Sequence, residues 1–424
     1  MRILLLTHYF EPEEGAPQRR WRALLERFVA AGNEVDVICP PPHYPGGRME
    51  ASLSPEAGRW GVTTTEYGVR VHRTSYLWHD GRIALRSLDH LWVAFAAVRA
   101  AQVRVAFGRL RPDVIIATAP GLPTLLAGNL LSRTLRVPLV AEMRDAWPDL
   151  VSHTPGFQRQ QGALGRVKHA VHERVTELQR RAAHVVTTTE AFAAVLGERG
   201  MRGTSVIRNG TQVERYSALP RRVNDHEELR VLYMGTIGRS QGLDVLIRAA
   251  AKLRDEGRPV AVRIIGAGAD VQRLRSLNSA LGEVVDLLPS VPGSQVADHY
   301  MWADTCVVSL RDWEPFKWTV PSKLYELLAA GRHISGIVAG ESAALIERTR
   351  SGDVIAPGDI DALAALWTRL AQDRSALEIG PDGRRWALQH VDYDVLARHY
   401  LTLLEDVVER TPRTKPDRRR MRRG

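Results

Sequence analysis

The stretch from residue 2 to residue 39 decides the fold class, because two apolar runs flank one amphipathic segment. "RILLLTHYF" (residues 2–10) is a nearly continuous apolar run, as expected for a strand covered on both faces. "PQRRWRALLERFVAAG" (residues 17–32) carries apolar residues at helical spacing, and "EVDVIC" (residues 34–39) predicts a second strand. This alternation of buried strands with a helix predicts a parallel α/β sheet.

The same alternation continues and then restarts, which indicates two domains. Further strand candidates are "DVIIATA", "PLVAEMRD" and "HVVTTT", and after a charged, turn-rich stretch the pattern resumes with "LRVLYMG". We therefore predict two doubly wound, Rossmann-like domains that face a cleft. The expected parts are a first domain (1–216), a linker (217–228), a second domain (229–380), a last helical stretch (381–410) that packs on either domain, and a disordered basic tail (411–424).

Composition narrows the class of protein. The 424 residues are 44% hydrophobic and 25% charged, as in ordinary globular proteins, and no apolar run approaches the ~20 residues that span a bilayer. Cys39 and Cys306 lack the spacing of metal ligands, so we expect two buried thiols in a reducing cytoplasm. The net charge of +10 suits a solubilising tail or contact with anionic lipid, and no accompanying motif indicates nucleic acid.

A glycine-rich turn opens the second domain. In open α/β sheets, ligands bind beyond the carboxyl ends of the strands. "YMGTIGRSQGL" (residues 233–243) follows a predicted strand and contains Gly235, Gly238 and Arg239. A turn of this kind with an arginine at the start of a helix fits a diphosphate. An ordinary flexible turn is the alternative.

Two other turns contain glycine directly after a strand. "IIGAGAD" (residues 264–270) carries Gly266 and Gly268, where close backbone approach would suit a nucleotide base, although such turns are often purely structural. Gly15 stands between the first strand and an arginine-rich helix, where backbone amides can attract an anion, although an ordinary turn is equally expected. The dinucleotide pattern G-x-G-x-x-G does not occur at this first turn.

A charged pair ends a strand of the first domain. In "EMRDAWPD" (residues 142–149), Arg144 and Asp145 are expected to point into the cleft from the opposite wall. Asp145 could hold a substrate hydroxyl or act as a base, or it could simply cap a helix beside the arginine.

The segment "VPSKLYELLAAGRH" (residues 320–333) predicts a helix with charged first turns. Ser322 is the expected N-cap, so Lys323 and Glu326 lie near the helix start. Lys323 adds a positive charge to a helix terminus that already favours phosphate, and Glu326 can accept hydrogen bonds from a ribose diol. A capping role for Glu326 is the alternative. All three residues are donor-binding candidates.

The order of these motifs resembles that of family 4 glycosyltransferases. The matching stretches are "HYFEPEEGAPQRRW", "RDAWP", "IRNGTQVERY", "GTIGRSQGLDVLIRAA", "RIIGAG", "YMWADTCVVSL" and "PSKLYELLAAGRHI". Members of that family are retaining enzymes of GT-B fold that use nucleotide-sugar donors. The Pro-Ser-Lys variant is similar to the subgroup that builds bacterial surface polysaccharides. The resemblance also implies that the last helix crosses back to the first domain.

The resemblance assigns roles to single residues. Glu326 corresponds to the second glutamate of the family's E-x7-E pattern, which binds the donor ribose, whereas the first glutamate falls on Trp318. Lys323 and nearby backbone amides are then expected to face the donor sugar. The family's first-domain histidine falls near Arg144, beside Asp145, so that pair joins Lys323 as the catalytic candidates.

The phosphate loop also departs from the family. Its usual basic residues fall near Thr236 and Gln241, neither of which is basic, so Arg239 and Lys323 are expected to balance the diphosphate. Preorganised donors of this kind stabilise the charge of a leaving phosphate. No Asp-x-Asp metal motif lies in a plausible loop, so we expect no metal and no cofactor other than the nucleotide-sugar co-substrate.

The expected activity is retaining transfer of a hexosyl or N-acetylhexosaminyl group. The donor implied by the resemblance is a UDP-sugar such as UDP-HexNAc, and the acceptor is a glycan, lipid-linked or small-molecule hydroxyl. Residues 81–110 and 157–182 are basic and amphipathic, which suits a lipid-linked acceptor at the cytoplasmic leaflet or simply a solvated face. A non-catalytic GT-B protein that binds nucleotide-sugars and a sugar-nucleotide 2-epimerase are the alternatives.

Overall fold

The chain forms two compact units. The computed structural model describes residues 1–13, 15–43, 46–49, 61–80, 82–119, 122–146, 149, 163–216, 219 and 227–411. Unit 1 comprises Met1–Thr188, Phe192–Ile207 and the chain from Leu396 onward, and unit 2 comprises Thr189–Ala191 and Arg208–Val395. The chain therefore changes unit at Arg208, before the expected linker. Most of that linker, and the tail after residue 411, lie outside the described residues.

Unit 1 is built on an eight-stranded sheet in the order β3-β4-β2-β1-β5-β6-β7-β8. Every pair is parallel except β3–β4, and β1 pairs on its two sides with β2 and β5, as predicted for a doubly wound sheet. The strands are β1 (Arg2–Leu6), β2 (Glu34–Cys39), β3 (Val62–Thr64), β4 (Arg70–Arg73), β5 (Val114–Thr118), β6 (Leu139–Met143), β7 (His184–Thr187) and β8 (Thr204–Val206).

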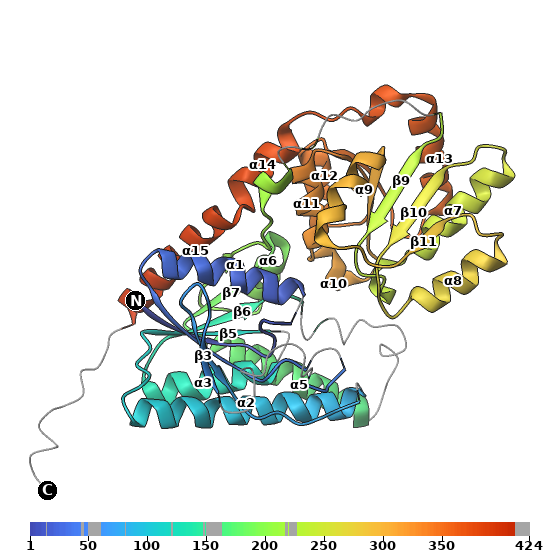
Figure 1. Cartoon of the computed structure of the whole chain (residues 1–424). Coiled ribbons are helices and arrows are strands. Elements are labelled where there is room, and N and C mark those ends of the chain that lie inside the picture. Colours follow the sequence, from blue (N-terminus) through green and yellow to red (C-terminus); the bar gives the residue numbers. More distant parts are fainter. Residues whose placement is uncertain are drawn as a thin grey trace, which may run out of the picture. The chain divides into compact units, whose positions relative to one another are not determined.

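Helices cover both faces of this sheet. Figure 1 shows α2 and α3 together on one face and α1 on the other. The helices among the described residues of this part of the chain are α1 (Ala16–Ala30), α2 (Ile83–Ala106), α3 (Leu122–Leu135), α5 (Ala163–Arg180) and α6 (Glu190–Glu198). The apolar stripe predicted for α1 is buried, including Trp21, Leu24 and Phe28. Cys39 at the end of β2 is a buried free thiol, as is Cys306 in unit 2, which confirms the expected state of both cysteines.

Unit 2 contains a six-stranded sheet in the order β11-β10-β9-β12-β13-β14, and all of its pairs are parallel. The strands are β9 (Arg230–Met234), β10 (Ala261–Ile265), β11 (Asp286–Leu288), β12 (Thr305–Ser309), β13 (His333–Ile337) and β14 (Gly352–Ile355). The order reverses between β9 and β12. In such sheets the point of reversal marks the usual ligand crevice.

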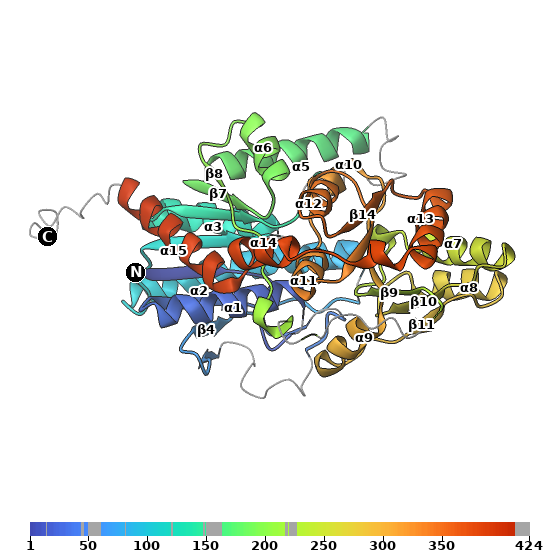
Figure 2. The ribbon, with the colours of Figure 1, turned by 90° about the horizontal axis from the view of Figure 1, so that it is seen from above.

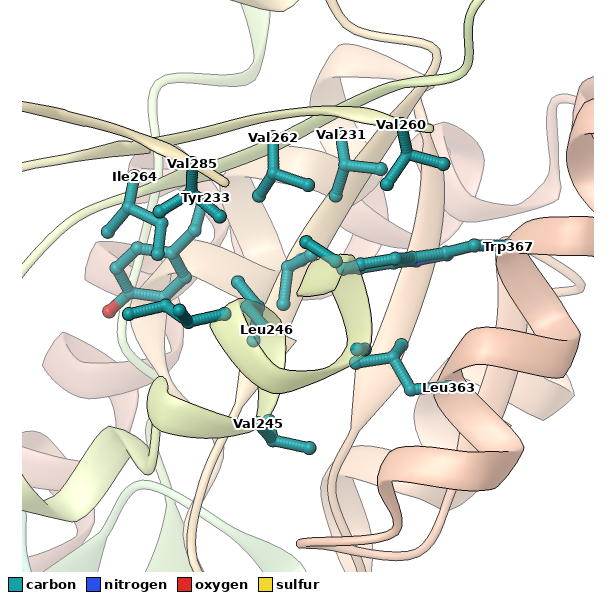
Figure 3. Packing of buried hydrophobic residues seen from close by; sticks show 14 of the residues in the cluster. Val231, Tyr233, Val245, Leu246, Val260, Val262, Ile264, Val285, Leu363 and Trp367 are labelled. Atoms are coloured by element: carbon teal, nitrogen blue, oxygen red, sulfur yellow. The ribbon is translucent and has the colours of Figure 1, made fainter. Parts of the chain in front are cut away.

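The helices of unit 2 bury a core on both sides of that sheet. Figure 3 shows Trp367 beneath Val231 and Val260, with Leu363 beside it, and Trp367 is completely buried. The α-helices are α7 (Asp244–Asp255), α8 (Val271–Ala280), α9 (Val296–Trp302), α10 (Glu314–Lys317), α11 (Ser322–Ala330), α12 (Glu341–Arg348), α13 (Ile360–Gln372) and α14 (Asp382–His390). Short 3-10 turns are η2 (Val213–Tyr216), η3 (Arg239–Gln241), η4 (Gly293–Gln295) and η5 (Arg374–Leu377).

The last helical stretch is two helices rather than one. α14 packs on α11 in unit 2, where Trp386 stacks on Tyr325 at 6.0 Å between ring centroids. α15 (Tyr393–Arg410) belongs to unit 1 from Leu396 onward. Its Tyr400 is fully buried against Trp21 and Phe28 of α1, and Figure 2 shows α15 lying beside α1. The chain thus returns to the unit in which it began. Among the described residues, no helix has the length and hydropathy needed to span a bilayer.

Candidate functional site

The glycine-rich turn after β9 is held by bonds within unit 2. The Gly235 N–H donates to the Ile265 carbonyl at 2.9 Å, and the Gly238 N–H donates to Oε1 of Gln241 at 3.1 Å. Both backbone amides that we expected to bind a diphosphate therefore already donate hydrogen bonds within unit 2. The Gln241 contact is a side-chain bond that rotation can break, whereas the Gly235 contact belongs to the backbone of the neighbouring strand end.

Gly266 and Gly268 approach backbone rather than open space. A Cβ on Gly266 would lie 1.8 Å from the Gly235 oxygen, and a Cβ on Gly268 would lie 2.2 Å from the Ile237 oxygen. Both residues also have φ values near +155° (154° and 156°), which L side chains rarely adopt. The close approach expected at this turn thus serves to dock it against the turn after β9.

Arginine side chains surround the same turn. Arg239 is exposed on the 3-10 turn η3. Arg311 fixes that turn from the end of β12, because its backbone N–H donates to the Ser240 carbonyl and its Nε donates to the Arg239 carbonyl at 2.7 Å. Arg273 of α8 pairs with Asp270 at 2.6 Å. The edge is thus rich in cationic groups, as a site for a phosphate requires.

The start of α11 differs from the predicted cap. The helix begins at Ser322, and the N-cap residue is Pro321, which makes no side-chain capping bond. The prediction that Ser322 is the N-cap is therefore wrong by one position. Pro321 sits in an extended conformation that ends the preceding loop, so the helix starts directly after it. Ser322 instead occupies the first helical turn.

Lys323 and Glu326 form one charged cluster with two tyrosines. Lys323 Nζ donates to Glu326 Oε2 at 2.6 Å and to the Tyr300 hydroxyl at 3.1 Å. The hydroxyls of Tyr300 and Tyr216 each donate to the same Glu326 oxygen at 3.4 Å. A Cβ on Gly235 would lie 3.9 Å from Lys323 Cε, so the cluster adjoins the glycine-rich turn.

This cluster leaves one carboxylate oxygen open. Burial, and then the neighbouring Glu326, raise the pKa of Tyr300 well above its ordinary value, so the phenol stays neutral and donates. Within the part of the chain that the structure describes, Glu326 Oε1 accepts no hydrogen bond. Lys323 and Glu326 keep 24% of their side-chain surface exposed. The cluster can therefore offer one acceptor and one cation to a ligand, and Glu326 does not cap the helix.

The sequence did not reveal the two tyrosines of this cluster. Tyr300 lies within α9 and Tyr216 ends η2, and they lie 26 and 110 residues from Glu326 along the chain. Neither stands at a strand end or in a glycine-rich turn, although both lie in stretches that carry the family resemblance, "IRNGTQVERY" and "YMWADTCVVSL".

The position of the family's missing first glutamate is taken by a half-buried tryptophan. The Trp318 carbonyl accepts a hydrogen bond from the Thr189 hydroxyl at 2.6 Å. The nearest preceding carboxylate, Glu314, is exposed and pairs with Lys317 at 2.7 Å. The donor-sugar contact expected of that glutamate therefore has to come from other groups.

In unit 1, Arg144 and Asp145 follow β6 and are half-buried. Arg144 Nε donates to the Ala119 carbonyl at 3.2 Å, and burial lowers the pKa of its guanidinium. Gly15 is the N-cap of α1, with extended backbone at φ 178°. These three residues lie in unit 1, and the donor-loop residues lie in unit 2.

Two glycosyltransferase models match consecutive parts of this chain. The model described as "Glycosyl transferase 4-like domain" matches residues 15–210, and the model described as "Glycosyl transferases group 1" matches residues 228–373. Together they span most of the chain and correspond to its two α/β units. The chain belongs to the glycosyltransferases of these two families.

Several curated proteins share sequence with it. WcaI of Escherichia coli, described as a putative colanic acid biosynthesis glycosyl transferase, is 26% identical over 78% of this chain and 82% of its own length. A GDP-mannose-dependent phosphatidylinositol monomannoside mannosyltransferase of Mycolicibacterium smegmatis is 30% identical over 35% of this chain and 41% of its own length.

Solved structures confirm the predicted fold class. Sucrose-phosphate synthase of Thermosynechococcus elongatus aligns with a TM-score of 0.72 at 18% identity, covering 96% of this chain and 99% of that one. HepE of Anabaena, solved in complex with UDP, aligns with a TM-score of 0.65 at 18% identity, covering 96% of this chain and all of that one. The fold is GT-B.

Proposed function

We propose that this glycosyltransferase transfers a sugar from a UDP-sugar to a hydroxyl of a lipid-linked acceptor in the synthesis of a surface polysaccharide. Lys323 and Arg239 would balance the diphosphate, and Glu326 would bind the ribose diol. The observation that carries the proposal is the open Glu326 oxygen beside Lys323 and the Gly235 turn. A ribose diol needs an acceptor of this kind and a diphosphate needs the adjacent cation.

The reaction we propose is retaining. The bond between the sugar C1 and the phosphate oxygen breaks, and its electron pair stays on the nucleoside diphosphate. The acceptor oxygen forms the new bond to C1 from the same face, and its proton passes to the leaving phosphate. Preorganised cations lower the energy of that developing charge, so the proposal requires no protein nucleophile.

Asp145 and Arg144 are proposed to act on the acceptor side. A carboxylate such as Asp145 can hold the acceptor hydroxyl by accepting its hydrogen bond. Asp145→Asn is expected to lower turnover by roughly tenfold or more, the loss of one charge-assisted hydrogen bond, and to leave donor affinity unchanged. Initial rates measure the turnover, and calorimetric donor titration of the same preparation measures the donor affinity. Weakened donor binding with normal turnover would contradict this assignment.

The surface of α2 supports the proposed lipid-linked acceptor. Its exposed side includes Leu88, Leu91 and Phe95, which are 53%, 51% and 58% exposed. Arg99 is exposed on the same helix, whereas Arg104 turns inward to His72. Exposed aromatic and aliphatic side chains beside arginine suit a membrane surface that contains anionic lipid. The outward face is thus more apolar and less basic than the sequence indicated.

A donor panel tests the core of the proposal. We would measure nucleotide release from UDP-, GDP- and dTDP-sugars with membrane extract as the source of acceptor. Release of UDP from one donor, lost in Lys323→Ala and stimulated by the extract, is the expected result. Release of GDP or dTDP would overturn the assignment of the base. Nucleotide binding without release from any donor would favour the non-catalytic alternative, and epimerised donor without transfer would favour the 2-epimerase.

A flotation assay tests the lipid part separately. Vesicles that contain phosphatidylglycerol should retain the full chain, and the double variant Leu91→Ser, Phe95→Ser should release most of it. Leu388→Ser in unit 2 is the matched control, because Leu388 is also an exposed leucine at 42%. Equal retention of all three proteins would contradict membrane contact through α2.

A further inference from the structure

Two histidines and an aspartate gather at the carboxyl edge of the sheet in unit 1. His8 follows β1, His43 follows β2, and Asp89 lies on α2. Asp89 Oδ2 lies 3.3 Å from His8 Nε2 and 3.1 Å from His43 Nε2, and the three ligand atoms lie within 4.8 Å of one another. Their side chains are 3%, 2% and 0% exposed. The glycosyl transfer proposed above uses none of them.

The hydrogen bonds of His43 leave two acceptor atoms of this cluster facing each other. His43 Nδ1 lies 2.7 Å from the Pro41 carbonyl, and a carbonyl only accepts, so the hydrogen of a neutral ring is on Nδ1. The bare Nε2 of that tautomer then faces a carboxylate oxygen that also only accepts. A cation is needed between these two atoms, either a proton or a metal ion.

In a second buried pair of unit 1, a donor faces an acceptor. His72 Nε2 lies 2.7 Å from Asp36 Oδ1, and Arg104 Nε donates to His72 Nδ1 at 2.8 Å. Because Nδ1 accepts there, Nε2 carries the hydrogen and donates it to the aspartate. This pair is complete with one proton, so it provides a matched comparison for the His43 cluster.

We propose that His8, His43 and Asp89 bind one divalent metal ion of the zinc class. Two imidazoles and one carboxylate are a common zinc ligand set, and bond lengths of about 2.0–2.1 Å place tetrahedral ligand atoms roughly 3.3 Å apart. The two distances to Asp89 Oδ2 match that separation. The third pair, the two imidazole nitrogens, lies within 4.8 Å and would have to close toward that separation when the ion binds.

The groups around the three side chains fit an outer ligand shell. Ligating histidines usually donate their other ring N–H to a carbonyl, as His43 does to Pro41, and ligating carboxylates are themselves hydrogen-bonded. Asp89 Oδ1 accepts the Leu77 N–H at 2.8 Å. The His43 backbone N–H donates to Glu13 Oε1 at 2.8 Å. The ion would tie β1, β2 and α2 together, with a fourth position left for a small oxygen ligand.

Metal content of the tag-free full chain tests the site. We expect about one zinc per chain by mass spectrometry. His43→Gln and Asp89→Asn should weaken metal affinity by more than about 100-fold, the upper end of the loss found when only an outer-shell partner is removed. His72→Gln is the matched control and should retain the metal. Metal retained in both ligand variants would overturn the site.

Cobalt titration keeps the test valid where a variant fails to fold. Wild-type protein is stripped with a chelator, its fold is checked by circular dichroism, and Co²⁺ is added. One equivalent should produce the visible absorption of a tetrahedral ion, and zinc should abolish it. A folded, stripped chain without those bands, together with no zinc in the purified protein, would show that a shared proton completes the cluster. Neither readout depends on glycosyl transfer.

Discussion

The carboxyl edges of the two sheets carry different kinds of charged groups. In unit 2, Lys323 and Glu326 are each 24% exposed, and one carboxylate oxygen has no partner among the described residues. In unit 1, the carboxylates of Asp89 and Glu142 are completely buried and bonded to buried cationic or imidazole groups. The charged groups at this position are thus partly exposed in unit 2, where we propose a ligand site, and buried against one another in unit 1. Removing residues from each edge should separate these two roles.

The largest effect is expected from Glu142→Ala in unit 1. Glu142 Oε1 accepts from Arg20 at 2.8 Å, and the two side chains are 0% and 2% exposed. Removing the carboxylate leaves a buried guanidinium without its counter-ion, which costs about 3–5 kcal/mol of unfolding free energy. Urea unfolding followed by circular dichroism measures it.

The control for this variant is an exposed ion pair of the same unit. Glu177 pairs with Arg181 at 2.7 Å, and each side chain is 41% exposed. Glu177→Ala should leave the unfolding free energy almost unchanged, because an exposed pair at this spacing contributes little. Similar losses of unfolding free energy in Glu142→Ala and Glu177→Ala would mean that the buried ion pair contributes no more to stability than the exposed one.

The next effect is on binding rather than stability. Lys323→Ala and Glu326→Ala should each weaken donor affinity by about 1.5–3 kcal/mol, because charge-assisted hydrogen bonds to the ligand are lost. This corresponds to roughly 10- to 150-fold in Kd. Unfolding free energy should change by less than about 1 kcal/mol, since the pair is partly exposed. Calorimetric titration with UDP and with the donor gives the affinity.

Lys252→Ala is the matched control for Lys323→Ala. Lys252 is an exposed lysine of α7 that pairs with Asp361 at 2.5 Å in the same unit. Its removal should leave donor affinity unchanged. Donor affinity that is equally preserved in Lys323→Ala and Glu326→Ala would place the nucleotide elsewhere and remove the contrast between the two edges.

Much of the fold could be predicted because its strands are buried on both faces. Runs such as "VIIAT" and "RVLYM" became β5 and β9, and the alternation with helices fixed the parallel pairing. The proximity of Lys323 to the Gly235 turn was also expected, because Lys323 and Arg239 of that turn were both assigned from the sequence to one diphosphate. The predicted N-cap of α11 was wrong by one position, because the helix can begin directly after Pro321 without a side-chain capping bond.

The partners that complete each site could not be predicted, because they are distant in the chain. His8, His43 and Asp89 are separated by 35 and 46 residues, and no short motif links them. Tyr300 and Tyr216 reach Glu326 only after α9 and η2 pack against α11. Tertiary packing brings these groups together, and local periodicity contains no information about it.

The smallest effect concerns the arginine-rich turn of unit 2 and depends on pH. The Arg273 side chain, at 2.6 Å, holds the pKa of Asp270 below its usual value, and Arg311 and Arg239 add to the effect. A carboxyl whose folded pKa is lower than its unfolded pKa of about 3.9 stabilises the protein above that pH and loses this contribution as the pH falls through the folded value.

Asp270→Asn should therefore lower the unfolding free energy by about 1 kcal/mol at pH 7, the typical contribution of one hydrogen-bonded pair. The difference from wild type should shrink as the pH falls from about 5 toward 3, because the wild-type carboxylate becomes protonated. Urea unfolding at several pH values measures this difference. A gap that stays constant with pH would mean that Asp270 contributes only packing. A difference in unfolding free energy that disappears at low pH would show that the Asp270 carboxylate already neutralises part of the positive charge at this edge before a diphosphate binds.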